Sequence, residues 1–185
     1  MAWIKTINYE DCDGQLKDEY DNIIKRRGKL SNIMKVHGLN PKAMRYHMDF
    51  YVSILFSNHD ITREERELIA TAVSVLNGCN YCINHHAEAL NFYWKDDNKL
   101  KSFIEDLTSI EFNKRQDSMI KYAITLTKEP NKISEDHVKN LRLVGLTEED
   151  ILNLNLIVSY FNFVNRVANG LGVEFSEEEV KGYKY

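Results

Sequence analysis

The sequence predicts an all-α protein, built as a bundle of helices. Apolar residues recur at three- and four-residue spacing in several long segments, and signals for helix starts and stops flank these segments. Valine and isoleucine fall within the same helical patterns, and no clear alternating strand pattern is visible. With 185 residues and a hydrophobic content of 43%, the chain is expected to form a single domain over residues 1–185.

The first clear helix is predicted to start at Asn40-Pro41, where asparagine would cap the helix and proline would occupy its first position. The residues that follow at helical spacing are Met44, His47, Met48, Tyr51, Val52 and Leu55. A second helix is predicted to start at Thr62, because Thr62 and Glu65 have the spacing of a capping box. It is expected to end near Asn77-Gly78, since glycine commonly follows a helix C-terminus.

Five further helices are predicted along the rest of the chain. They cover Cys79 to about Trp94, roughly Lys99–Leu107, Asn113–Thr127, Ser134 to near Gly145, and Thr147 to Asn169-Gly170. The last of these opens with Thr147 and Asp150 at capping spacing. These boundaries place a central core at about 40–95 and C-terminal helices at about 113–170.

Charge and composition argue against nucleic acid and membrane as partners and indicate a cytoplasmic location. A net charge of −4 argues against nucleic acid as the main partner, which would normally require a basic face. No apolar run approaches the roughly 20 residues that cross a bilayer, and no secretory signal is visible, so a cytoplasmic protein without a membrane partner is expected. Structural disulfides are rare in that compartment, and Cys12, which has no obvious thiol partner, is expected to be a bystander.

The most informative segment runs from Glu67 to His86. It places Cys79 and Cys82 three residues apart, with His86 four residues after Cys82. On a helix of 3.6 residues per turn, these three side chains share one face within about 60°. His86 is therefore a better partner for Cys82 than His85, which falls on the flank of that face.

The position of the two cysteines favours thiol chemistry. Both are predicted to lie in the first turn of a helix, after a sharp turn at Gly78. Unpaired backbone N–H groups and the helix dipole there favour negative charge, which should lower a thiol pKa. The spacing of Cys79 and Cys82 also permits a reversible dithiol–disulfide cycle.

Glu67 is predicted to orient His86. If the two helices form an antiparallel hairpin about Asn77-Gly78, His86 lies opposite about position 69, within one turn of Glu67. Glu67 would then orient the base, and His86 would handle the thiol proton.

The segment resembles the alkylhydroperoxidase D and carboxymuconolactone decarboxylase family. Peroxidase members carry a glutamate, eleven intervening residues, a Cys-x-x-Cys pair and a histidine four residues later, which Glu67, Cys79, Cys82 and His86 match. The run 162–174 is similar to the end of the last core helix in the peroxidase-related subgroup. The resemblance implies an all-helical bundle that assembles as a homo-oligomer.

The resemblance also implies a thiol-dependent hydroperoxide reductase. Cys82 would attack a hydroperoxide and Cys79 would resolve the sulfenic acid to a disulfide, with Glu67 and His86 as the proton relay. No tightly bound cofactor or metal is expected, because an external dithiol, from a thiol protein or a lipoyl-bearing partner, would reduce the disulfide. Cys82 is expected to be the more buried cysteine and Cys79 the more accessible one. The cysteine pair argues against lactone decarboxylation, which does not rely on it.

One position departs from the best-known peroxidase member, which has a histidine immediately before its second cysteine. Tyr81 stands there in this chain, and its hydroxyl titrates near pH 10. The helical count directs Tyr81 away from the cysteine face. Core packing and subunit contacts are the expected roles of Asn165 and Arg166, and a place near the pocket is the alternative. Neither residue is assigned a catalytic role.

Two alternatives remain open at this point. Cys79, Cys82 and His86 share a face and could bind zinc in a structural or interaction module, with Glu67 or His85 as the fourth ligand. Alternatively, the same fold could serve as a redox sensor or as a non-peroxidase enzyme acting on a small carbonyl compound.

Overall fold

The computed structural model describes residues 2–183 and is all-helical over that range, without strands. The α-helices are α1 (Gly14–Arg27), α2 (Asn32–Val36), α3 (Pro41–Leu55), α4 (Arg63–Leu76), α5 (Asn80–Trp94), α6 (Asp97–Glu105), α7 (Lys114–Lys128), α8 (Glu135–Leu143), α9 (Glu148–Gly170) and α10 (Glu177–Val180). The predicted fold class is therefore confirmed.

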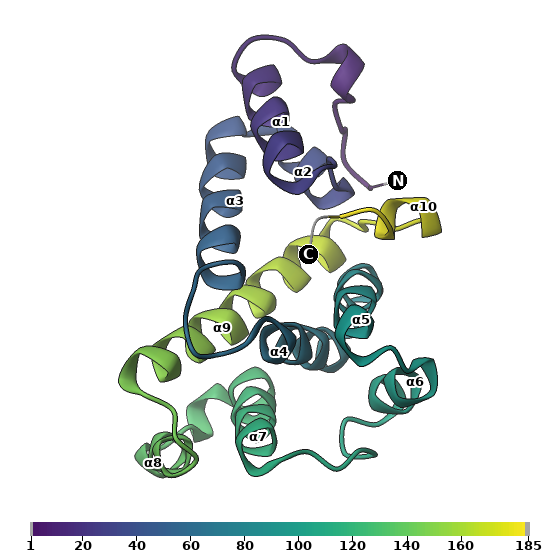
Figure 1. Ribbon diagram of the computed structural model, residues 1–185. Coiled ribbons are helices and arrows are strands. Elements are labelled where there is room, and N and C mark those ends of the chain that lie inside the picture. Colours follow the sequence, from purple (N-terminus) through teal and green to yellow (C-terminus); the bar gives the residue numbers. More distant parts are fainter. Residues whose placement is uncertain (1, 184–185) are drawn as a thin grey trace.

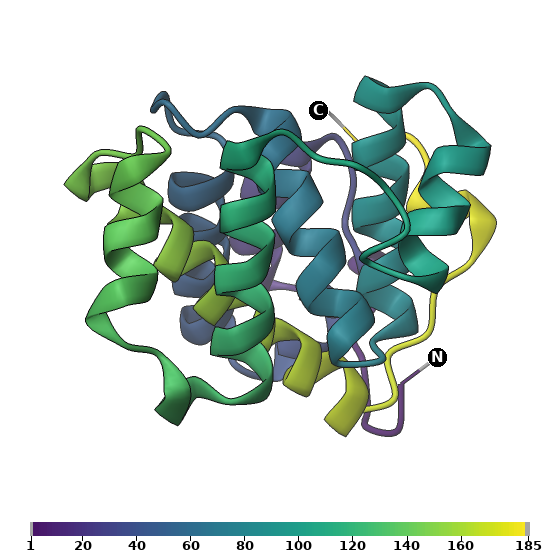
Figure 2. The same cartoon turned by 90° about the horizontal axis from the view of Figure 1, so that it is seen from below.

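The helices pack around α4, which contacts α5, α7 and α9 (Figure 1). Seen from below, α7, α4 and α5 lie side by side, and the long α9 crosses them (Figure 2). Helix α4 is buried along most of its length, because its apolar residues face neighbours on several sides. It therefore forms the centre of the hydrophobic core.

Local signals placed the starts of α3, α4 and α9 correctly, whereas α6 spans Asp97–Glu105 in place of the predicted Lys99–Leu107. Asn40 caps α3 by accepting from the Ala43 N–H, and Pro41 is the first helical residue. Thr62 and Thr147 both form the predicted capping boxes, at the starts of α4 and α9. The helix predicted from Cys79 begins at Asn80, with Cys79 as its cap.

Three short or peripheral helices, α1, α2 and α10, lie outside the predicted ranges. The N-terminal helices pack on α3, and the C-terminal segment returns across α5 to lie beside α2 (Figure 1). Trp3 donates its backbone N–H to the Leu171 carbonyl at 2.8 Å, which joins the N-terminal segment to the end of α9. Both ends thus cover the central helices on the same side.

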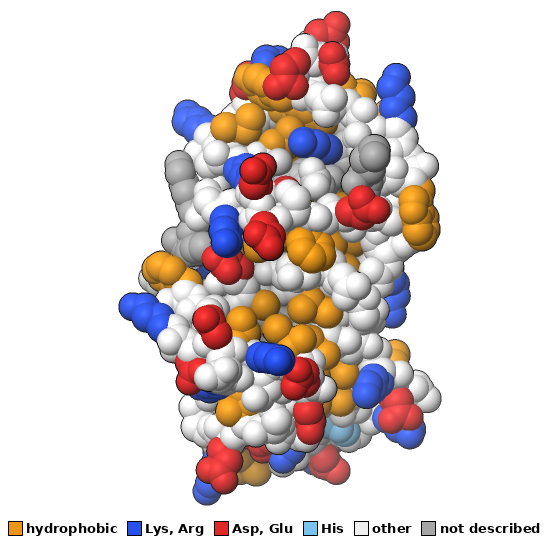
Figure 3. Space-filling view, turned by 90° about the vertical axis from the view of Figure 1, so that its right-hand side faces the viewer, with side chains coloured by type: hydrophobic (Ala, Val, Ile, Leu, Met, Phe, Trp, Pro, Cys, Tyr) orange, Lys and Arg blue, Asp and Glu red, His pale blue; other side chains and the backbone are white. Residues whose placement is uncertain are grey.

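The surface carries mixed charge. Acidic and basic side chains are interspersed on the face that Figure 3 shows, around a band of apolar side chains. Among the described residues, no helix is both long and apolar enough to span a membrane.

The cap of α4 provides a test of how much the helix start contributes to stability. Thr62 Oγ1 accepts from the Glu65 N–H at 3.2 Å, and Glu65 Oε2 accepts from the Thr62 N–H at 2.9 Å. We expect Thr62→Ala to lower the free energy of unfolding by about 1 kcal/mol, whereas Thr62→Ser should stay within a few tenths of a kcal/mol. Urea denaturation measures both, and equal stability of the alanine and wild-type proteins would contradict the expectation.

Candidate active site

The hairpin of α4 and α5 brings Glu67 and His86 into contact, as predicted. His86 Nδ1 lies 2.6 Å from Glu67 Oε2. Gly78 makes the turn between the helices with φ of +59°, a conformation that residues with a side chain rarely adopt. The count along the hairpin therefore placed these two side chains correctly.

Glu67 is an ionised carboxylate held inside the protein. It is fully buried and forms an ion pair with Arg63, one helical turn earlier. Burial raises the pKa of Glu67, but the Arg63 guanidinium and the hydrogen bond from His86 outweigh burial and leave the pKa below its ordinary value. Because an ionised carboxylate can only accept, Nδ1 of His86 carries the proton and Nε2 is left as a base.

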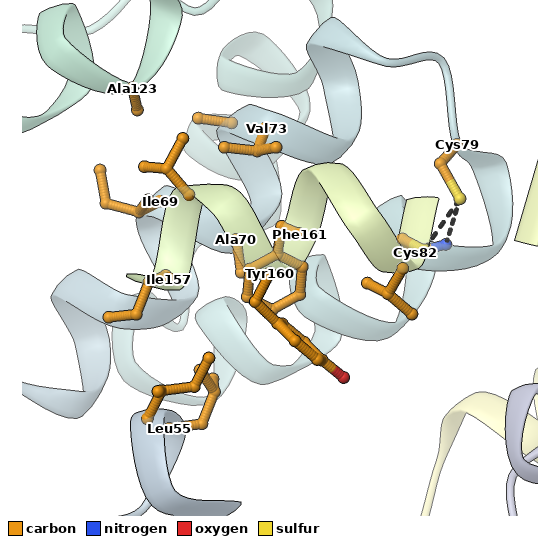
Figure 4. Packing of buried hydrophobic residues seen from close by; sticks show 14 of the residues in the cluster. Leu55, Ile69, Ala70, Val73, Cys79, Cys82, Ala123, Ile157, Tyr160 and Phe161 are labelled. Carbon is orange, nitrogen blue, oxygen red and sulfur yellow. Dashed lines mark hydrogen bonds between the residues drawn. The ribbon is translucent and has the colours of Figure 1, made fainter. Parts of the chain in front are cut away.

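The two thiols lie together at the start of α5. Cys79 Sγ lies within hydrogen-bond distance of Cys82 Sγ, at 2.8 Å, and both are free thiols (Figure 4). Cys79 is the N-cap, and its sulfur accepts from the Cys82 N–H at 3.4 Å. The helix start thus offers donors to one sulfur in particular, that of Cys79.

The pKa values of the two thiols move in opposite directions. The hydrogen bond from Cys82 lowers the pKa of Cys79 against burial, with help from backbone N–H groups. The same bond and burial raise the pKa of Cys82, despite a hydrogen bond from Asn165 that lowers it. A lowered pKa was expected at both cysteines, so the expectation is wrong for Cys82.

The exposure of the two cysteines also differs from expectation. Cys79 is 0% exposed and Cys82 is 3% exposed, so Cys79 is not the more accessible thiol. The N-cap position explains this, because it tucks Cys79 between the end of α4 and the start of α5. Exposure alone therefore does not assign roles to the two thiols.

The two cysteines differ in their contact with a cavity of about 80 Å³. Cys82 lines it together with Glu67 and His86, whereas Cys79 is not among the described residues that do. Its volume is enough for several water-sized groups. The remaining wall mainly combines three kinds of side chain: aromatic rings (Tyr51, Tyr81, His85, Tyr160, Phe161 and Tyr183), cations (Arg27, Lys29 and Arg63) and aliphatic groups (Ile23, Ile33, Met34, Met48, Ala89 and Val164).

A zinc site is not supported by this geometry. Within residues 2–183, no group of three or more histidine, cysteine or acidic side chains converges as metal ligands would. In place of such a cluster, His86 binds Glu67 and Cys79 binds Cys82, as two separate pairs.

Tyr81 and His85 are part of the wall of the cavity. Both also contact Glu179 of α10: Tyr81 Oη donates at 2.9 Å, and His85 Nε2 lies 2.9 Å from the carboxylate. The Tyr81 hydroxyl thus bonds Glu179 rather than a cysteine, although its side chain lines the same cavity as Cys82. Burial raises the pKa of Tyr81 well above its ordinary value, so it remains a neutral phenol.

The two polar residues late in α9 have different environments. Asn165 is fully buried, hydrogen-bonds Cys82, and accepts from Asn77 at 3.0 Å. Arg166 is exposed and donates to Asn162. Sequence reasoning left Asn165 out of the site, although its place one helical turn after Phe161 of the core was a usable signal.

Comparisons with known proteins connect this arrangement to a family. Residues 41–92 match the model of the carboxymuconolactone decarboxylase family. The uncharacterized protein YdfG of Bacillus subtilis (strain 168) is 22% identical over 143 residues, which are 77% of this chain and 96% of that protein.

Solved structures share the fold over nearly the whole chain. An uncharacterized peroxidase-related protein from Ralstonia eutropha JMP134, described as an alkylhydroperoxidase AhpD core, matches with a TM-score of 0.86 at 22% identity, over 97% of this chain and 94% of that one. The debrominase Bmp8, in complex with 2,3,4-tribromopyrrole, matches with a TM-score of 0.78 at 20% identity, over 95% of this chain and 92% of that one. The match at residues 41–92 and the shared fold therefore relate this chain to the carboxymuconolactone decarboxylase family and to the fold of the alkylhydroperoxidase AhpD core.

Proposed function

We propose that the protein is a thiol-dependent hydroperoxide reductase. The observation that carries the proposal is the cavity that Cys82 shares with the Glu67–His86 pair, with a second thiol 2.8 Å behind Cys82. A nucleophile, a base oriented by a carboxylate and a resolving thiol are the groups that such a reaction needs.

The first half of the proposed cycle is an oxidation of Cys82. His86 takes one proton from the thiol pair, which leaves a thiolate shared between the two sulfurs. Transfer of the remaining proton from Cys82 to Cys79 moves the negative charge to the sulfur that lines the cavity. Cys82 then attacks the terminal peroxide oxygen, so that an S–O bond forms, the O–O bond breaks and an alkoxide leaves.

The second half restores the dithiol. Cys79 attacks the sulfenic sulfur of Cys82, hydroxide leaves and takes up a proton as water, and a disulfide forms. The backbone N–H groups at the start of α5 suit this step, because they favour the thiolate of Cys79. An external dithiol, such as a lipoyl-type group or a thiol protein, then reduces the disulfide. We also propose a homo-oligomer in the cytoplasm, without a resident cofactor.

The test is a thiol count with and without a reductant. One equivalent of an alkyl hydroperoxide should remove two thiols from the reduced protein, and peptide mapping should find Cys79 joined to Cys82 with Cys12 still free. Sustained peroxide consumption with excess dithiol should follow. An unchanged thiol count would overturn the proposal, and a disulfide without turnover would identify a redox sensor.

Reductive debromination is a second candidate. A structural neighbour is a debrominase bound to a bromopyrrole, and the cavity wall here is rich in aromatic rings. The balanced reaction joins the thiols of Cys79 and Cys82 while the substrate exchanges bromine for hydrogen and releases bromide as HBr. Bromide release from a bromopyrrole, without peroxide consumption, would favour this reaction over peroxide reduction.

A further inference from the structure

A buried chain of hydrogen bonds leads from the cavity toward the surface, outside the predicted site. Tyr160 of α9 lines the cavity, and its hydroxyl lies 2.6 Å from His47 Nε2 of α3. His47 Nδ1 lies 3.1 Å from His37 Nε2, in the short turn between α2 and α3. Figure 4 shows the Tyr160 hydroxyl pointing out of the apolar cluster.

The contact of His37 with the Ile33 carbonyl determines which groups donate and which accept along this hydrogen-bond chain. His37 Nδ1 lies 2.8 Å from the carbonyl oxygen of Ile33, so Nδ1 carries a proton. When both histidines are neutral, His37 Nε2 therefore accepts from His47 Nδ1, and His47 Nε2 accepts from the Tyr160 hydroxyl. Burial and the neighbouring His37 lower the pKa of His47 to about 3, so His47 rests in the neutral form.

The hydrogen-bond chain runs from a partly exposed residue, His37, to a buried one, Tyr160. His47 and Tyr160 are buried, whereas His37 is half-buried and reaches the surface. A proton added at His37 would reverse each hydrogen bond, because His37 Nε2 would donate to His47, and His47 Nε2 would donate to Tyr160. The Tyr160 hydroxyl would then be free to donate into the cavity.

We propose that Tyr160 is the proton donor to the leaving oxygen, and that His47 and His37 resupply it from the surface. The inference rests on the proposed peroxide chemistry, in which attack by Cys82 releases an alkoxide that needs a proton. Tyr160 donates its proton to the alkoxide, His47 Nε2 returns one to Tyr160, and His37 Nε2 returns one to His47 Nδ1. The imidazolium of His37 becomes neutral, which leaves the chain in the arrangement that the structure shows.

The test uses two oxidants that differ in their need for a proton. Tert-butyl hydroperoxide releases a strongly basic alkoxide, whereas peroxyacetic acid releases weakly basic acetate. We expect Tyr160→Phe to slow Cys82 oxidation by tert-butyl hydroperoxide roughly 10²-fold in a single turnover, and to change the rate with peroxyacetic acid by less than about threefold. Rapid quenching and thiol mass spectrometry measure both rates in the same protein, so a folding defect would slow both.

Two further variants separate proton transfer from structure. His47→Gln keeps an acceptor and a donor at that position but cannot relay a proton, and it should show the same selective loss. Tyr46→Phe, at an exposed tyrosine next to His47 in sequence, should leave both rates unchanged.

The outcomes distinguish this inference from the proposed function. If wild-type thiols react with neither oxidant, the peroxidase proposal is overturned and this inference falls with it. If wild-type reacts with both oxidants and Tyr160→Phe shows no selective loss, the proton comes from another group, such as the His86 imidazolium, and only the donor role of Tyr160 is overturned.

Discussion

Cys82→Ser is expected to abolish peroxide reduction, whereas Cys79→Ser should retain a single oxidation event per chain. Cys82 is the sulfur that lines the cavity beside His86, so its removal leaves no nucleophile where a peroxide can bind. Removal of Cys79 leaves the attacking sulfur in place but takes away the thiol 2.8 Å behind it. The sulfenic acid of Cys82 would then persist, because no neighbouring thiol can form the disulfide.

The measurement is peroxide consumed per chain, with a dimedone adduct to locate the sulfenic acid by mass spectrometry. Cys12→Ser is the matched control, since this half-buried thiol donates to the Tyr9 carbonyl at 3.0 Å, and it should keep full turnover. The reverse pattern, with a stable adduct on Cys79 in Cys82→Ser, would mean that Cys79 attacks. The test is sharp because two observations favour different cysteines: the pKa shifts favour the thiolate at Cys79, whereas the cavity is lined by Cys82.

Local signals predicted the parts of the fold that depend on short stretches of chain. The caps at Asn40, Thr62 and Thr147 are made by side chains within three residues of the groups they bind. The contact of Glu67 with His86 spans only one tight turn, so counting helical turns on either side was sufficient. These features therefore required no knowledge of tertiary packing.

Contacts between distant segments could not be predicted in this way. Glu179 reaches Tyr81 across 98 positions, and His47 reaches Tyr160 across 113. Neither pair has a periodicity or a motif that would join its members, because the packing of α10 on α5 and of α9 on α3 brings them together. The contacts of Tyr81 with Glu179 and of Asn165 with Asn77 could not be predicted for the same reason.

The thiol pair shows a subtler limit of sequence reasoning. The helix start was expected to lower both pKa values, but one proton shared between two close sulfurs splits them apart. The difference between the two pKa values depends on which sulfur caps the helix, and Cys79 occupies that position. A shift by one residue in the helix start would change this balance, and the pattern of apolar residues does not define helix starts that finely.

Glu67→Gln is expected to slow Cys82 oxidation roughly 10²-fold and to lower stability at neutral pH. An amide carries no charge to favour the proton on Nδ1 of His86, so Nε2 is no longer held as the base. Arg63 also loses its carboxylate partner in the protein interior, which should cost roughly 1–3 kcal/mol in the free energy of unfolding.

The pH dependence of stability separates this loss from a general defect in packing. The pKa of Glu67 is lowered in the folded protein against burial by Arg63 and His86, so the unfolded chain binds its proton more readily. The contribution of Glu67 is thus present above the ordinary carboxyl pKa, about 4.3, and is lost as pH falls through the folded value. Wild-type and Glu67→Gln stabilities should therefore converge toward low pH in urea titrations. Glu88→Gln, at a half-exposed site on α5, should track wild-type at every pH, and a constant gap for Glu67→Gln would show that its carboxylate charge contributes nothing.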